Sequence, residues 1–154
     1  MSQVTVRSVV YQIDGQSYES RLAFDASQKN PLPGLLMAPN WMGVSAGAEE
    51  IAKSVAAKGY VVLIADLYGQ TVRPSNGDEA GAAMMPLKND RPLLNKRMQA
   101  ALEQLLGQTE AAVDTSKLAT FGFCFGGCCS LELARTGAPV KAAISFHGTL
   151  DTPN

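Results

Sequence analysis

Hydrophobic positions along the chain follow two spacings, and the change from one to the other predicts where strands and helices lie. Two early segments, 4–11 and 18–24, are rich in β-branched and aromatic residues and flank the turn signal Asp14-Gly15. This pattern predicts an antiparallel hairpin with a slightly long connection. The prolines of the segment 30–33 are then expected to break the chain.

After this break, short continuous apolar runs alternate with segments of helical spacing. Strands are expected over residues 34–38, 60–65, 117–123 and 141–146, and helices over 46–58, 78–85, 92–106 and 126–135. Ser45 is a suitable N-cap for the first helix, and Gly59 is its expected stop. Because strands that alternate with helices pair in parallel, we predict an α/β fold. It has a mostly parallel sheet with helices on both faces and an antiparallel hairpin at the N-terminus.

Composition narrows the class of protein. The chain has 154 residues, of which 46% are hydrophobic and 18% charged, as in one compact domain. The net charge of −1 offers no electrostatic attraction to nucleic acid or to an anionic membrane. The longest apolar run, near 60–65, is too short to span a bilayer, and the N-terminus lacks a secretory pattern. We therefore expect a cytoplasmic protein with neither nucleic acid nor membrane as a partner.

The segment Gly-Phe-Cys-Phe-Gly, residues 122–126, carries the strongest chemical signal. It ends a predicted strand and opens a predicted helix, which is the context of a nucleophile elbow with cysteine in place of serine. Gly122 and Gly126 would let the strand and the helix pass closely at this sharp turn. Cys124 would then stand above the sheet at a helix N-terminus, whose N–H groups favour an anion. The alternative is a buried cysteine without chemistry.

The neighbours of this cysteine have different expected roles. Cys128 and Cys129 match no C-x-x-C redox or zinc spacing, so we expect them to pack as small hydrophobic residues, and we expect no metal or cofactor. All three cysteines lie in one cluster, which is no disulfide framework and favours a reducing compartment. Acyl transfer also needs oxyanion donors, and the candidates are the backbone N–H groups of Phe125 and Trp41.

Three segments in series, GLLMAPNWMGV, AAKGYVVLIADLYG and GFCFGG, resemble the dienelactone hydrolase family of the α/β-hydrolase superfamily. The resemblance covers most of residues 34–146 and implies an α/β-hydrolase fold. It also implies that Cys124 hydrolyses small esters or lactones through a thioacyl-enzyme intermediate. The family commonly has a glutamate where this chain has Asn40, which can hydrogen-bond a thiol or substrate but cannot take a proton. The activation route or the preferred substrate is therefore expected to differ. Asp66 also matches the family, and we interpret it as a structural carboxylate.

An acid and then a histidine should follow the nucleophile in this fold. After Cys124 the sequence has only His147 and then Asp151, which is the reverse order. We expect His147 to border the pocket at a strand end. Residues 1–154 are interpreted as a single, incomplete α/β-hydrolase domain whose C-terminal strands are missing from this chain. The remainder is expected either as a separate C-terminal fragment of the same protein, cleaved near Asn154, or as the continuation of a longer chain. It would supply the aspartate and the histidine, and would cover the strand edge at 141–146.

Two other functions stay open at this point. One is a non-catalytic α/β-hydrolase-like binding protein, and the other is a thiol redox sensor that uses the cysteine cluster. The sequence assigns no arginine to a substrate carboxylate. Arg73 and Arg91 are expected only near the mouth of the pocket.

Overall fold

The computed structural model describes residues 3–153 and confirms the predicted α/β-hydrolase fold. Its strands are β1 (Val4–Ile13), β2 (Gln16–Asp25), β3 (Leu32–Ala38), β4 (Val61–Ile64), β5 (Val113–Phe123) and β6 (Ala142–Phe146). They form one sheet in the order β1-β2-β4-β3-β5-β6. β2 pairs antiparallel with β1 and β4, whereas β3 pairs parallel with β4 and β5, and β6 pairs parallel with β5. The N-terminal hairpin and the parallel remainder therefore agree with the sequence prediction.

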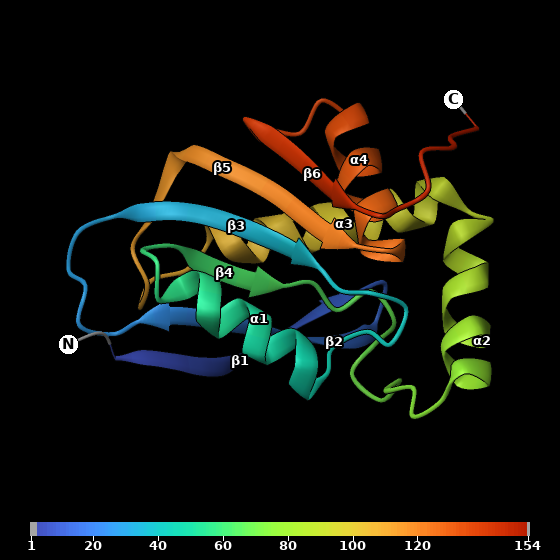
Figure 1. Ribbon diagram of the computed structural model, residues 1–154, viewed down its shortest axis with the longest axis horizontal. Helices are drawn as coiled ribbons and strands as arrows, with labels where there is room; N and C mark the ends of the chain where they lie inside the picture. The colour runs from blue at the N-terminus through green and yellow to red at the C-terminus, as the bar shows by residue number, and fades with distance from the viewer. Residues whose placement is uncertain (1–2, 154) are drawn as a thin grey trace.

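Helices cover both faces of the sheet, as predicted. They are α1 (Ala46–Ala56), α2 (Gly77–Lys88), α3 (Arg91–Leu106) and α4 (Phe125–Arg135). Figure 1 shows α1 on one face and α3 with α4 on the other, while α2 stands at the side of the sheet. Val62 and Ile64 of β4 pack under α1, whereas Leu63 packs on the face of α3. This strand is apolar at every position because both of its faces are buried.

The hairpin turn is tighter than predicted. Only Asp14 and Gly15 connect the two strands, and Ile13 pairs directly with Gln16. Both turn residues have positive φ, 50° and 81°, which is the backbone of a type I′ turn. The prediction of a longer connection was wrong because this turn matches the twist of the strands, so that pairing continues up to it.

Two prolines lie inside elements where the sequence predicted an end. Pro33 belongs to β3, and the pairing of β3 with β5 shifts its register between Pro33 and Gly34. A proline lacks the N–H that a regular ladder needs, and an irregular point in the ladder tolerates this loss. Pro86 lies near the end of α2, which continues to Lys88 rather than stopping at Met85.

β6 forms one edge of the sheet and supports the segment around Cys124. Ile144 and Phe146 of this strand remain 46% and 45% exposed. The Phe146 ring stacks on Phe123 with ring centres 4.9 Å apart. The Phe146 carbonyl oxygen accepts a hydrogen bond of 2.9 Å from the Cys124 N–H. The edge strand thus fixes one end of the turn from β5 into α4.

Gly122 and Gly126 lie where this turn crosses the end of β3. A Cβ atom at Gly122 would overlap the backbone of Gly126, and a Cβ at Gly126 would overlap the Ala38 carbonyl oxygen. Backbone atoms of a helix or a paired strand cannot move away as the end of a flexible side chain can. The absence of side chains at both positions is therefore a packing requirement of the fold.

We predict that Gly126→Ala destabilises the protein by about 1–3 kcal/mol or more, the usual cost of overpacking a close contact. Gly81→Ala is the matched control, because a Cβ at this position of α2 would meet nothing within 4 Å. That control should be neutral or more stable by up to about 1 kcal/mol, from helix propensity. Equal unfolding midpoints for the two variants in urea would contradict this packing account.

Candidate active site

Cys124 has the backbone of a strained turn between β5 and α4. Its φ of 56° and ψ of −119° lie in a region that non-glycine residues rarely occupy. Its carbonyl oxygen accepts the Gly127 N–H at 3.0 Å, and its side chain is exposed. Since the backbone is bonded on both sides, the thiol is held above the end of the sheet. The sequence predicted this arrangement from the two glycines.

The thiol opens into a mostly apolar cavity of about 560 Å³. Its lining residues come from the end of β3, the following loop, α1 and the ends of β5 and β6: Met37, Asn40, Trp41, Met42, Ser45, Gly47, Ala48, Ile51, Phe123, Cys124 and His147. Three residues that the sequence singled out, Asn40, Trp41 and His147, thus share one cavity with Cys124. The volume suits a small organic molecule.

The two candidate oxyanion donors belong to different elements. Phe125 is the first residue of α4, so its N–H has no acceptor within the helix. Trp41 lies in the loop after β3, with its side chain 38% exposed. Within residues 3–153, neither N–H donates to a protein acceptor. Trp41 lines the cavity, whereas Phe125 is 5% exposed and is not among its lining residues, so the role of the two N–H groups as oxyanion donors stays a prediction.

Asn40 closes the turn that carries Trp41. Its carbonyl oxygen accepts the Gly43 N–H at 3.0 Å, and its Oδ1 accepts the Met42 N–H at 2.9 Å. Gly43 has a φ of 74°, which a side chain would disfavour. The Asn40 side-chain oxygen therefore stabilises its own turn, while the expected hydrogen bond of Asn40 to the thiol or the substrate stays a prediction.

Tyr68 contacts this turn without lining the cavity, and the sequence patterns did not indicate it. Its hydroxyl donates a hydrogen bond of 2.8 Å to the Trp41 carbonyl oxygen. Burial raises the pKa of the Tyr68 phenol well above its usual value, with smaller effects from Cys129 and Cys124. The available signal was the position of Tyr68 just after β4, whose carboxyl end lies beside that of β3.

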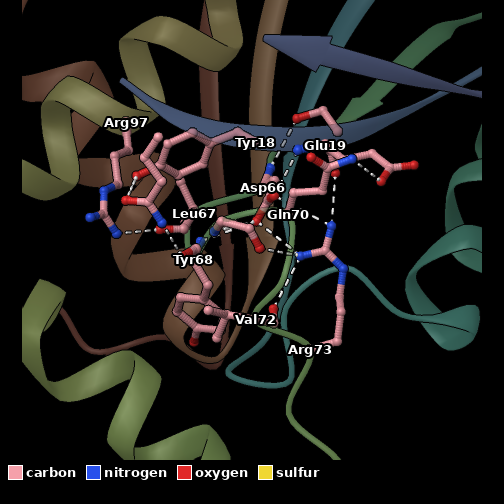
Figure 2. A network of polar contacts seen from close by, with 12 residues as sticks. Tyr18, Glu19, Asp66, Leu67, Tyr68, Gln70, Val72, Arg73 and Arg97 are labelled. Carbon is pink, nitrogen blue, oxygen red and sulfur yellow. Dashed lines mark hydrogen bonds and ion pairs between the residues drawn. The ribbon is translucent and has the colours of Figure 1, made fainter. Parts of the chain in front are cut away.

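Asp66 is a structural carboxylate in this network, which Figure 2 shows from close by. It is 1% exposed and accepts the N–H groups of Glu19, Tyr68 and Gly69 at 2.8–3.1 Å. The Arg73 guanidinium lies 3.3 Å from its Oδ1. With these partners the carboxylate fixes the loop after β4.

The remaining candidates lie away from the cavity. Arg73 is held by Asp66, and Arg91 is buried against Glu132 at 3.0 Å, so neither lines the cavity that contains the thiol. Cys128 and Cys129 are 1% and 0% exposed. Burial raises the pKa of the Cys129 thiol well above its usual value. These environments are typical of cysteines that pack in a core.

Among residues 3–153, no three side chains of His, Cys, Asp or Glu gather as a metal-binding group. In the same part of the chain, no helix has the length and apolar character needed to cross a bilayer. The polar side chains that line the cavity include those of Cys124, Asn40, Ser45 and His147.

Known proteins resemble this chain over most of its length. A relative from Bradyrhizobium sp, described as a probable 2-oxo-3-(5-oxofuran-2-ylidene)propanoate lactonase, is 33% identical over 141 residues. That match covers 89% of this chain but 55% of the relative, so the chain spans about half of the relative's length.

Solved structures share the architecture. A dienelactone hydrolase-like promiscuous phosphotriesterase from metagenomic libraries has a TM-score of 0.89 and 36% identity, over 97% of this chain and 62% of that one. The dienelactone hydrolase of Anabaena variabilis, at 21% identity, shares the fold with a TM-score of 0.68, over 95% and 64% of the two chains. The model of the dienelactone hydrolase family matches residues 20–154, which include both the elbow and the turn of Trp41. The chain therefore belongs to the dienelactone hydrolase family.

Proposed function

We propose that this protein hydrolyses small carboxylic esters or lactones with Cys124 as the nucleophile. The observation that carries the proposal is the strained backbone of Cys124, which presents an exposed thiol to a cavity of about 560 Å³. Membership of the dienelactone hydrolase family supports the reaction class. A nucleophilic thiol also suits a reducing compartment, so we propose that the protein works in the cytoplasm.

The proposed reaction has two acyl-transfer steps. The Cys124 thiolate attacks the carbonyl carbon, and the N–H groups of Phe125 and Trp41 hold the oxygen as it becomes negative. The carbon–oxygen bond to the leaving group then breaks, and the departing alkoxide takes a proton from a histidine acid. Water, deprotonated by the same histidine, attacks the thioester, the carbon–sulfur bond breaks, and the thiolate is restored. In a lactone the leaving alkoxide stays in the product as its hydroxyl group.

The proposed acid and histidine come from a C-terminal segment of the same protein. The exposed Ile144 and Phe146 of β6 support this, because an apolar edge strand is a site for further pairing. An apolar groove of about 440 Å³ runs beside it, lined by residues that include Leu35, Val55 and Tyr60. The greater length of the relatives also supports it. His147 then borders the cavity without acting as the base.

We predict that Cys124→Ala abolishes hydrolysis of p-nitrophenyl acetate, because no other thiol opens into the cavity. Cys128→Ala and Cys129→Ala are matched controls, since both side chains are buried away from it. These two variants should retain most of the turnover. Wild-type turnover in the Cys124 variant would contradict the assignment of the nucleophile.

A second prediction concerns the charge at Asn40. Asn40→Glu places a carboxylate in the cavity of Cys124, and a nearby negative charge disfavours the thiolate. The pH profile of Cys124 alkylation by iodoacetamide should therefore move to higher pH. Asn40→Gln is the control, because it has the same length without the charge. If both variants give the same profile, Asn40 does not adjoin the thiol.

A third prediction addresses the source of the acid and the histidine. Intact-mass analysis of active protein from its natural source should find either a longer chain or a second associated fragment. The additional sequence should contain an aspartate followed by a histidine, the order that the fold requires. Full activity from a protein whose mass equals residues 1–154 alone would refute the proposed C-terminal segment.

A further inference from the structure

The turn of residues 40–43 is ordered by three hydrogen bonds. Two of them are internal, from the N–H groups of Met42 and Gly43 to oxygens of Asn40. The third comes from the Tyr68 hydroxyl to the Trp41 carbonyl oxygen at 2.8 Å. Within the described part of the chain, this third bond is the only one that ties residues 40–43 to another element.

These bonds fix two successive peptide planes. The carbonyl of Asn40 faces the Gly43 N–H, and in a planar trans peptide the N–H points the opposite way. The Trp41 N–H therefore points out of the turn. The next peptide plane joins Trp41 to Met42 and is held at both ends. Its N–H, from Met42, donates to Asn40 Oδ1, and its carbonyl oxygen, from Trp41, accepts from the Tyr68 hydroxyl. Rotation of either plane would break a hydrogen bond.

We propose that Tyr68 is a positioning residue that holds the Trp41 N–H in place to donate to the reacting oxygen. This inference rests on the proposed hydrolase function and deepens it. Tyr68 does not line the cavity that contains the thiol, so it acts through the turn rather than on the substrate. Its role is to reduce the freedom of one oxyanion donor before the reaction begins.

Tyr68 is itself held rigidly. Its ring lies against Gly43, where a Cβ atom would come within 3.0 Å of a ring carbon. Its N–H donates to Asp66 Oδ1 at 3.1 Å, and Arg73 lies 3.3 Å from the same oxygen (Figure 2). Because burial raises the pKa of the phenol, the hydroxyl keeps its proton and remains a donor at neutral and mildly alkaline pH. A connected path therefore leads from the buried Asp66 to the turn of Trp41.

The test is Tyr68→Phe, which removes the hydroxyl and keeps the ring. Loss of an oxyanion donor costs about 10²–10³ in kcat, and loosening one should cost less, about 10-fold. We expect this fall in kcat for p-nitrophenyl acetate, with KM within about twofold of wild type. Alkylation of Cys124 by iodoacetamide forms no oxyanion, so its rate should not change. Tyr11→Phe is the control, since it also removes a tyrosine hydroxyl from a buried hydrogen bond, with Ser20 at 3.0 Å, and Tyr11 does not line the cavity.

Amide hydrogen exchange supplies a readout that does not need turnover. In Tyr68→Phe the amides of Met42 and Gly43 should exchange faster, whereas those of β4 should not. Equal kcat and equal exchange in Tyr68→Phe and wild type would overturn the inference. A parallel loss of turnover and alkylation would also overturn it, by showing a general structural effect. If wild type has no esterase activity, the proposed function fails, and unchanged exchange at Met42 and Gly43 then rejects the positioning role separately.

Discussion

The close crossing of the β5–α4 turn over the end of β3 is the constraint on which the candidate site depends. Gly122 and Gly126 pack against each other and against the Ala38 carbonyl oxygen with no room for a side chain. This contact lets β5 change into α4 within one residue, and Cys124 takes the strained backbone at that point. A strained conformation persists only where the surrounding structure enforces it. Here the contacts that enforce it come from the central strand β3, from the edge strand β6 and from the first turn of α4.

The same crossing places Cys124 at one cavity with the turn of residues 40–43, which carries Trp41. Residue 38 ends β3, and the turn of residues 40–43 follows it at once, so the strand that packs on the elbow also carries Trp41. β4 lies on the other side of β3 and brings Tyr68 behind that turn. Three adjacent strand ends thus carry the proposed nucleophile, one proposed oxyanion donor and the residue proposed to orient that donor. This agrees with the rule that parallel sheets bind ligands at the carboxyl ends of their strands.

Local sequence patterns predicted the elements and the elbow because each depends on neighbouring residues. Glycines two positions on either side of Cys124 identify the elbow, and Ser45 accepts the Ala48 N–H as a cap should. The tight hairpin turn and the start of β3 at Leu32 depend on the register of strand pairing, which the local sequence pattern does not give. The bond from Tyr68 to Trp41 joins residues 27 positions apart. It follows from the place of β4 beside β3, so no spacing along the chain could have indicated it.

The central claim is that a thioester forms on Cys124, and trapping that intermediate tests it most directly. The protein is mixed with a p-nitrophenyl ester, quenched in acid within milliseconds, digested and examined by peptide mass spectrometry. The account predicts the mass of the acyl group on the peptide that contains Cys124, located at that residue by fragmentation and lost in neutral hydroxylamine. Acylation at Ser130, Cys128 or another side chain, with Cys124 unmodified during turnover, would contradict it.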